Sequence, residues 1–241
     1  MNTNKQKNYL ETQKTSKQKI ILQEGLVNMK IQEEIENLNK MLIKMADVVE
    51  RNLLLAFALF HNYDEEIALQ IDDDKVNDYE RKIEEYSMNL MLKERFFAKD
   101  MRSVLGILTL VGDLERLGDH AEDINIFSKK LKNEKKYKID DINKMIDLAI
   151  KMVHNSIESF IKKDISLAQQ VIISDDLIDS LYDKLLDTII KLKDDNQVSS
   201  SFAIYTTLVV KYIERIADHA SNIAEWVIYI LNGYYKDKQI F

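Results

Sequence analysis

The sequence contains one decamer twice: residues 115–124 read ERLGDHAEDI, and residues 214–223 read ERIADHASNI. Glu, Arg, Asp, His, Ala and Ile agree at the same offsets, and the copies lie roughly 100 residues apart. Two unrelated amphipathic helices would share apolar positions, but they would not share Arg, Asp and His together. The chain is therefore an internal duplication, and each decamer marks the same place in one repeat.

Oxygen-bearing side chains recur along one helical face of each decamer. Residues four apart lie on the same side of an α-helix. The sequence therefore predicts two acidic rows: Glu115, Asp119 and Asp123 in the first copy, and Glu214, Asp218 and Asn222 in the second. At about 100° per residue, Leu117 lies nearly opposite Glu115 and Asp119. We expect the carboxylates on the outside of their bundle, near the surface.

The composition favours helices throughout the chain. The 241 residues include no proline and only 5 glycines, on which strands and tight turns rely. Apolar residues recur at helical spacing from Leu26 onward. The predicted fold is all-α: two tandem three-helix bundles related by the internal duplication.

The pattern divides the chain into three parts. Residues 1–25 are polar and Lys-rich, and we expect a disordered or loosely helical extension there. The first three-helix repeat is expected over 26–133 and the second over 137–235. One short acidic segment in each repeat is predicted to cap a helix. These segments are residues 72–74, which are three aspartates, and residues 174–176, which are a serine and two aspartates.

Charge and composition exclude several classes of function. The formal net charge of -7 argues against nucleic acid as a partner, because its binders carry concentrated basic surface. Cysteine is absent, which excludes disulfides, thiol nucleophiles and thiolate metal sites. No segment reaches the roughly 20 apolar residues that cross a bilayer, and the first residues lack the apolar region of a signal peptide. We expect a cytoplasmic protein without membrane insertion.

The acidic rows indicate metal binding. Carboxylates four apart repel each other by a few tenths of a kcal/mol per pair, and Arg116 and Arg215 do not neutralise a whole row. Oxygen ligands suit Mg²⁺, Mn²⁺, Ca²⁺ and oxidised iron. We expect Asp74 and Asp176, on the neighbouring helices, to complete the coordination. The alternative is a solvated helix face without a ligand.

No catalytic constellation is visible. A di-iron bundle needs Glu three residues before His, but the residues at those positions are Ala58, Leu117, Lys151 and Ile216. Phosphate-binding loops, nucleophile elbows and zinc-protease motifs are absent from the sequence. We therefore expect a protein that is not an enzyme. The histidines are interpreted as packing or hydrogen-bonding residues: His61, His120, His154 and His219.

The doubled Glu-Arg-x-x-Asp-His-Ala motif, in two units of about 100 residues, resembles the PhoU family. The resemblance covers about residues 28–232, and the family's acidic signature corresponds to Glu115 with Asp119 and Glu214 with Asp218. It implies a two-repeat, six-helix protein, commonly a homodimer, whose acidic motifs bind iron or zinc clusters. It also implies contact with the phosphate ABC transporter ATPase and a sensor histidine kinase, which restrains phosphate uptake and the phosphate-starvation response.

Two positions depart from equal repeats. Asn77 stands where the second repeat has Asp179, and Asn222 stands where the first has Asp123, so the two sites need not bind equally. The resemblance implies a metal-binding regulatory adaptor of phosphate homeostasis. Two alternatives stay open: an accessory protein of another phosphate or metal transporter, and a purely structural helical bundle.

Overall fold

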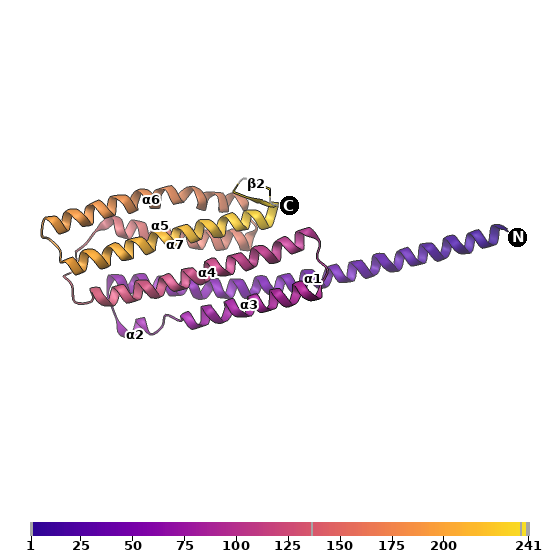
Figure 1. The fold of residues 1–241 in the computed structure, drawn as a ribbon, viewed down its shortest axis with the longest axis horizontal. Helices are drawn as coiled ribbons and strands as arrows, with labels where there is room; N and C mark the ends of the chain where they lie inside the picture. Colours follow the sequence, from indigo (N-terminus) through magenta and orange to yellow (C-terminus); the bar gives the residue numbers. More distant parts are fainter. Residues whose placement is uncertain (1, 136, 237, 240–241) are drawn as a thin grey trace.

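The computed structural model describes the backbone of residues 2–135, 137–236 and 238–239, and the side chains of residues 29–135 and 137–236. The described chain is almost entirely helical (Figure 1). Its helices are α1 (Asn2–His61), α2 (Glu65–Ala68), α3 (Asp73–Lys93), α4 (Ala98–Leu131), α5 (Asp140–Lys162), α6 (Ile165–Asp194) and α7 (Ser200–Asn232). The predicted all-α fold is confirmed. None of the described helices is long and apolar enough to span a lipid bilayer.

Two three-helix bundles lie side by side (Figure 1). The first repeat supplies α1, α3 and α4, and the second supplies α5, α6 and α7. The main contact between them joins α4 to α7, the two helices that carry the decamers. Leu117 of α4 and Ile216 of α7, which hold the same decamer position, are both fully buried and belong to one continuous core. The duplication therefore produces one packed body.

α4 and α7 run antiparallel. The rings of His120 and His219, from the middle of each helix, lie 5.4 Å apart. Towards the end of α4, Phe127 stacks on Tyr205 near the start of α7, with ring centroids 6.3 Å apart. Because the two histidines occupy the same decamer position, the contact is arranged about a local pseudo-twofold axis.

α6 differs from the prediction. It runs unbroken from Ile165 to Asp194, so the cap predicted at 174–176 is wrong. The N-cap is Asp164, whose carboxylate accepts a hydrogen bond from the Leu167 N–H at 3.1 Å. Ser174 instead donates its hydroxyl hydrogen back to the carbonyl of Gln170. The segment contains neither proline nor glycine, so its backbone chemistry does not end a helix there.

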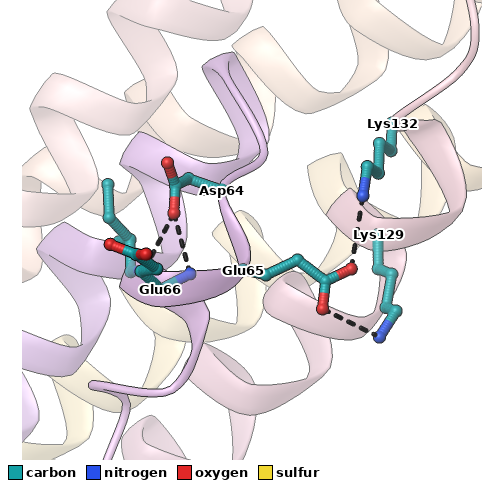
Figure 2. A network of polar contacts seen from close by, with 6 residues as sticks. Asp64, Glu65, Glu66, Lys129 and Lys132 are labelled. Atoms are coloured by element: carbon teal, nitrogen blue, oxygen red, sulfur yellow. Dashed lines mark hydrogen bonds and ion pairs between the residues drawn. The ribbon is translucent and has the colours of Figure 1, made fainter.

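The first repeat keeps its break between α2 and α3. As predicted, the acidic triplet caps α3: the Asp72 carboxylate accepts from the Lys75 N–H at 3.1 Å. Upstream, Asp64 caps α2 by accepting from the Glu66 N–H at 2.8 Å. Glu65 pairs with Lys132 at 3.2 Å, which ties α2 to the C-terminal end of α4 (Figure 2).

The N-terminal extension is helical, one of the two states expected for it. Residues 2–25 continue α1, which projects beyond the two bundles (Figure 1). The buried residues of the described core begin at Ile31. Packing from Ile31 onward nucleates the helix, so residues towards the N-terminus extend it without a new nucleation penalty. Many of these residues are Lys and Gln, which are good helix formers.

A short hairpin follows α7. Gly233 ends the helix in the left-handed conformation, with φ 84°, as its place in the sequence predicted. The strands β1 (Tyr234–Tyr235) and β2 (Lys238–Gln239) then pair antiparallel. Tyr235 stacks on Trp226 of α7, with ring centroids 4.3 Å apart. The hairpin thereby brings Lys236 to within 3.3 Å of Glu225 on α7.

Candidate functional site

A groove of about 860 Å³ opens where α4 packs against α7. The first repeat lines it with Glu115 and Asp119 of α4. The second repeat lines it with Asp175 of α6 and Asp218 of α7. The antiparallel pairing of the decamer helices thus brings carboxylates of both repeats to one groove.

The first repeat holds a carboxylate cluster between α3 and α4. Its members are Asp73, Glu80, Glu115, Asp119 and Glu122. Burial raises the pKa of each of these carboxyls, and the negative charges of their neighbours raise it further. One carboxylate oxygen of Asp73 accepts from the Asn77 amide at 2.8 Å, but its Oδ1 is buried without a hydrogen bond.

The second repeat holds the matching cluster between α6 and α7. Its members are Asp175, Asp179, Glu214 and Asp218. Burial, followed by the charges of Asp218 and Asp179, raises the pKa of Asp175 to about 6. Burial and the Glu214 charge likewise raise the pKa of Asp218. As in the first repeat, Oδ1 of the α6 aspartate is buried without a hydrogen bond of normal geometry.

The predicted acidic rows lie on these clusters. Glu115 with Asp119 and Glu214 with Asp218 contribute directly to them. The row ends differ: the Asp123 charge raises the pKa of Asp119, whereas its counterpart Asn222 is an uncharged side chain in the groove wall.

On the neighbouring helices, the structure brings the residues just before the two predicted ones to the acidic rows. Asp74 and Asp176 are exposed, and the preceding residues, Asp73 and Asp175, lie against the acidic rows instead. The reason is helical rotation. Asp73 stands three residues before the buried Val76, on nearly the same side, whereas Asp74 is turned away.

Besides Asp73, two further members of the first cluster were missed. Glu80 lies two helical turns beyond Asp73, and Glu122 lies two turns beyond Glu115, so each continues an identified face. That spacing was the available signal. In the second repeat, Ser221 stands where the first has Glu122.

The clusters offer oxygen donors for a cation. Among the described side chains, no group of three or more His, Asp or Glu is placed to hold a metal ion. However, the donors are all carboxylates, which hard cations favour. In each repeat, one buried carboxylate oxygen lacks a hydrogen bond of normal geometry, at Asp73 and at Asp175. The residues present therefore fit a cation by the chemistry of their donor set.

The two decamer histidines have different partners. His219 Nδ1 lies 2.8 Å from Asp113 Oδ1. His120 meets the ring of Tyr212, the residue at the position of Asp113 in the second repeat, with centroids 5.0 Å apart. Both ring nitrogens of His120 are buried without a hydrogen bond. Burial, followed by the charges of His219, Arg215 and Arg116, lowers the pKa of His120 to about 4, so the ring is neutral at pH 7.

The fold and the clusters define a duplicated helical-bundle protein with one surface carboxylate cluster in each repeat. The PhoU domain matches residues 42–125 and 142–227, and the chain belongs to the PhoU family. The family resemblance of the sequence is thereby confirmed.

Relatives and solved structures match most of the chain. The phosphate-specific transport system accessory protein PhoU homolog of Aquifex aeolicus is 34% identical over 208 residues, which cover 85% of this chain and 94% of the relative. The homolog of Clostridium acetobutylicum is 29% identical over 204 residues, covering 83% and 93%. The crystal structure of PhoU from Pseudomonas aeruginosa has a TM-score of 0.80 at 28% identity, covering 84% of this chain and 99% of that one.

Proposed function

We propose that this chain is a non-enzymatic regulatory adaptor of phosphate transport. While phosphate is plentiful, it lowers phosphate uptake and represses the phosphate-starvation response. The observation that carries the proposal is the presence of both PhoU domains, each with its own carboxylate cluster. The names of the relatives, phosphate-specific transport system accessory proteins, support the same role.

The adaptor acts in the cytoplasm as a homodimer that contacts the ATPase of a phosphate ABC transporter and a sensor histidine kinase. Long helices offer broad, rigid faces for such contacts. Large apolar side chains exposed on α6 and α7 support docking there: Ile190 of α6 is 59% exposed and Ile204 of α7 is 58% exposed.

Affinity purification tests the partners. Tagged protein is isolated from phosphate-replete and phosphate-starved cells, and co-purifying proteins are identified by mass spectrometry. We expect the transporter ATPase and the histidine kinase in the replete sample. Recovery of a different phosphate or metal transporter would favour the accessory-protein alternative. If no transport or signalling protein were enriched over an untagged control, a purely structural bundle would become the better interpretation.

In this proposal, each carboxylate cluster binds iron or zinc cations. Mg²⁺, Mn²⁺ and Ca²⁺ are the alternatives, because they also bind carboxylate oxygens. The core donors would be Asp73, Glu115 and Asp119 in the first repeat, and Asp175, Glu214 and Asp218 in the second. Asp123 and Asn222 extend the two rows. A bound cation supplies positive charge that offsets the mutual repulsion of these carboxylates.

Replacing Glu115, Asp119, Glu214 and Asp218 together by Ala tests the metal sites. We expect loss of bound metal, measured by elemental analysis, with helicity retained in circular dichroism. The matched control replaces Asp74 and Asp176, which are exposed beside the clusters, and should retain the metal. Undiminished metal in the fourfold variant would refute the site assignment.

A further inference from the structure

Two arginines line the groove without an ion pair to any described carboxylate, although the charge of Arg116 partly offsets the burial that raises the pKa of Glu115 and of Asp119. Arg116 and Arg215 hold the same decamer position, are exposed, and both line the groove between α4 and α7. The charge of Arg116 acts on its neighbour Glu115, and Arg215 lies over the Tyr212 ring at 5.5 Å. Among the described side chains, neither guanidinium forms an ion pair. Their hydrogen-bond donors therefore remain available in the groove.

A buried donor lies in the wall of the same groove. His120 is only 8% exposed, lines the groove, and has no hydrogen bond at either ring nitrogen. An unpaired buried polar group is unfavourable, and a ligand that accepts its N–H removes part of that penalty. A neutral imidazole carries one such N–H.

The ligand that fits these donors is a tetrahedral oxyanion. The planar guanidinium matches the geometry of phosphate oxygens, and two arginines from opposite repeats can share one phosphate. However, carboxylates outnumber positive side chains in the groove wall, so an oxyanion alone would be repelled. Cations held by carboxylates commonly share phosphate oxygens as ligands. Cations bound by the two carboxylate clusters would make the groove attract the oxyanion instead of repelling it.

We propose that the groove binds a phosphate-type oxyanion jointly with the cations of the two carboxylate clusters. Arg116 and Arg215 hold its oxygens, and His120 donates from the wall. This inference rests on the proposed cation binding. Because the two ligands attract each other, each raises the affinity for the other by the same factor. The groove thus reports phosphate only when the clusters carry metal.

Equilibrium dialysis of the full chain against radiolabelled inorganic phosphate tests the inference, with and without Mn²⁺ at micromolar concentrations. We expect phosphate binding only with Mn²⁺ present. Arg116→Gln with Arg215→Gln should weaken phosphate binding by about tenfold or more while Mn²⁺ still binds. The matched control is Arg95→Gln, an exposed arginine in the α3–α4 connection, which should bind like the unmodified protein. Circular dichroism verifies that both variants fold.

The outcomes separate this inference from the metal proposal. Phosphate binding without Mn²⁺, or equal binding by the double variant, would overturn it. Mn²⁺ binding without phosphate binding would overturn it and leave the metal sites intact, whereas no Mn²⁺ binding would remove both. A competing phosphoserine peptide distinguishes the source: displacement of labelled phosphate identifies a phosphoryl group on a protein as a ligand, and no displacement identifies free phosphate.

Discussion

At the residue scale, one substitution between the repeats decides the state of two histidines. His219 has the Asp113 carboxylate beside it, whereas His120 meets Tyr212 at the equivalent position. The decamer places the two histidines at the same offset and does not reveal this difference. The differing residues, Asp113 and Tyr212, each stand seven positions before the histidine of their own helix. Each contacts the histidine of the other helix, so the difference appears only once α4 and α7 are packed together.

The histidines should therefore respond unequally to substitution. His219→Phe leaves the largely buried Asp113 carboxylate without its partner, and we expect a loss of about 1–2 kcal/mol in the free energy of unfolding. His120→Phe removes unpaired nitrogens and keeps a ring beside Tyr212, so stability should be unchanged or higher. Denaturant titration measures both, and equal losses would contradict the assignment.

The raised pKa of Asp175 predicts that the stability of the protein depends on pH. Its pKa is about 6 in the folded protein against a model-peptide value of 3.8. The folded state holds the proton more tightly, so the contribution of this carboxyl is fully present below about pH 4 and is lost as the pH rises through about 6. In metal-free buffer at pH 7.5, Asp175→Asn should raise the free energy of unfolding by about 1 kcal/mol, a figure reduced for solvent screening of a half-buried group.

Near pH 3.5 the same substitution should have little effect, because the carboxyl is then protonated in both states. The neighbour Asp176 supplies the control, since it is exposed and turned away from the cluster. Asp176→Asn should leave the pH profile of thermal unfolding unchanged. If both variants shifted the profile equally, Asp175 would not be the cluster member.

At the element scale, the helices that carry the decamers and the start of α3 were predictable, whereas the unbroken course of α6 was not. The decamer fixes the register of α4 and α7, and Gly233 fixes the end of α7. The acidic triplet at 72–74 caps a helix, but the similar triplet at 174–176 lies inside α6. A cap sequence permits a helix start without requiring one, and the segment before Ser174 is itself a good helix former.

Two glycines of α4 should behave in opposite ways when replaced by Ala. A Cβ on Gly106 would clash with Cγ1 of Ile230 on α7, whereas a Cβ on Gly112 would meet nothing within 4 Å. Gly112→Ala should stabilise by up to about 1 kcal/mol through helix propensity. Gly106→Ala should destabilise by about 1–3 kcal/mol through overpacking.

A double-mutant cycle tests the second effect. Ile230→Ala removes the atoms that Gly106→Ala would strike, so the combined variant should lose less than the sum of the single losses. Additive losses would mean that α4 and α7 do not approach closely at this point.

At the scale of the whole molecule, the two repeats share one core. α4 and α7 pack against each other across the two bundles, and Leu117 and Ile216 are buried in the shared core, so neither bundle can unfold without exposing apolar surface of the other. The tandem arrangement was predictable from the duplication. The merging of the cores was not, because apolar periodicity shows which face is buried and leaves open what covers it.

Unfolding should therefore be a single cooperative event. Trp226, the only tryptophan of the chain, reports on the second repeat through its fluorescence, and far-UV circular dichroism reports on all helices. We expect the two denaturation curves to coincide. A tryptophan transition that preceded or followed the loss of helicity would show that the repeats unfold separately.

The pseudo-twofold axis between α4 and α7 also has an evolutionary meaning. A half-length ancestor with the same helix would have met its own copy through this surface, as a symmetric pair of separate chains. In such a pair, every mutation changes both sides of the axis at once. After gene fusion, each side could change alone, and the difference between Asp113 and Tyr212 at equivalent positions is a divergence of that kind. Fusion thereby allowed one histidine to keep a carboxylate partner while its twin became a buried, unpaired group beside the arginines.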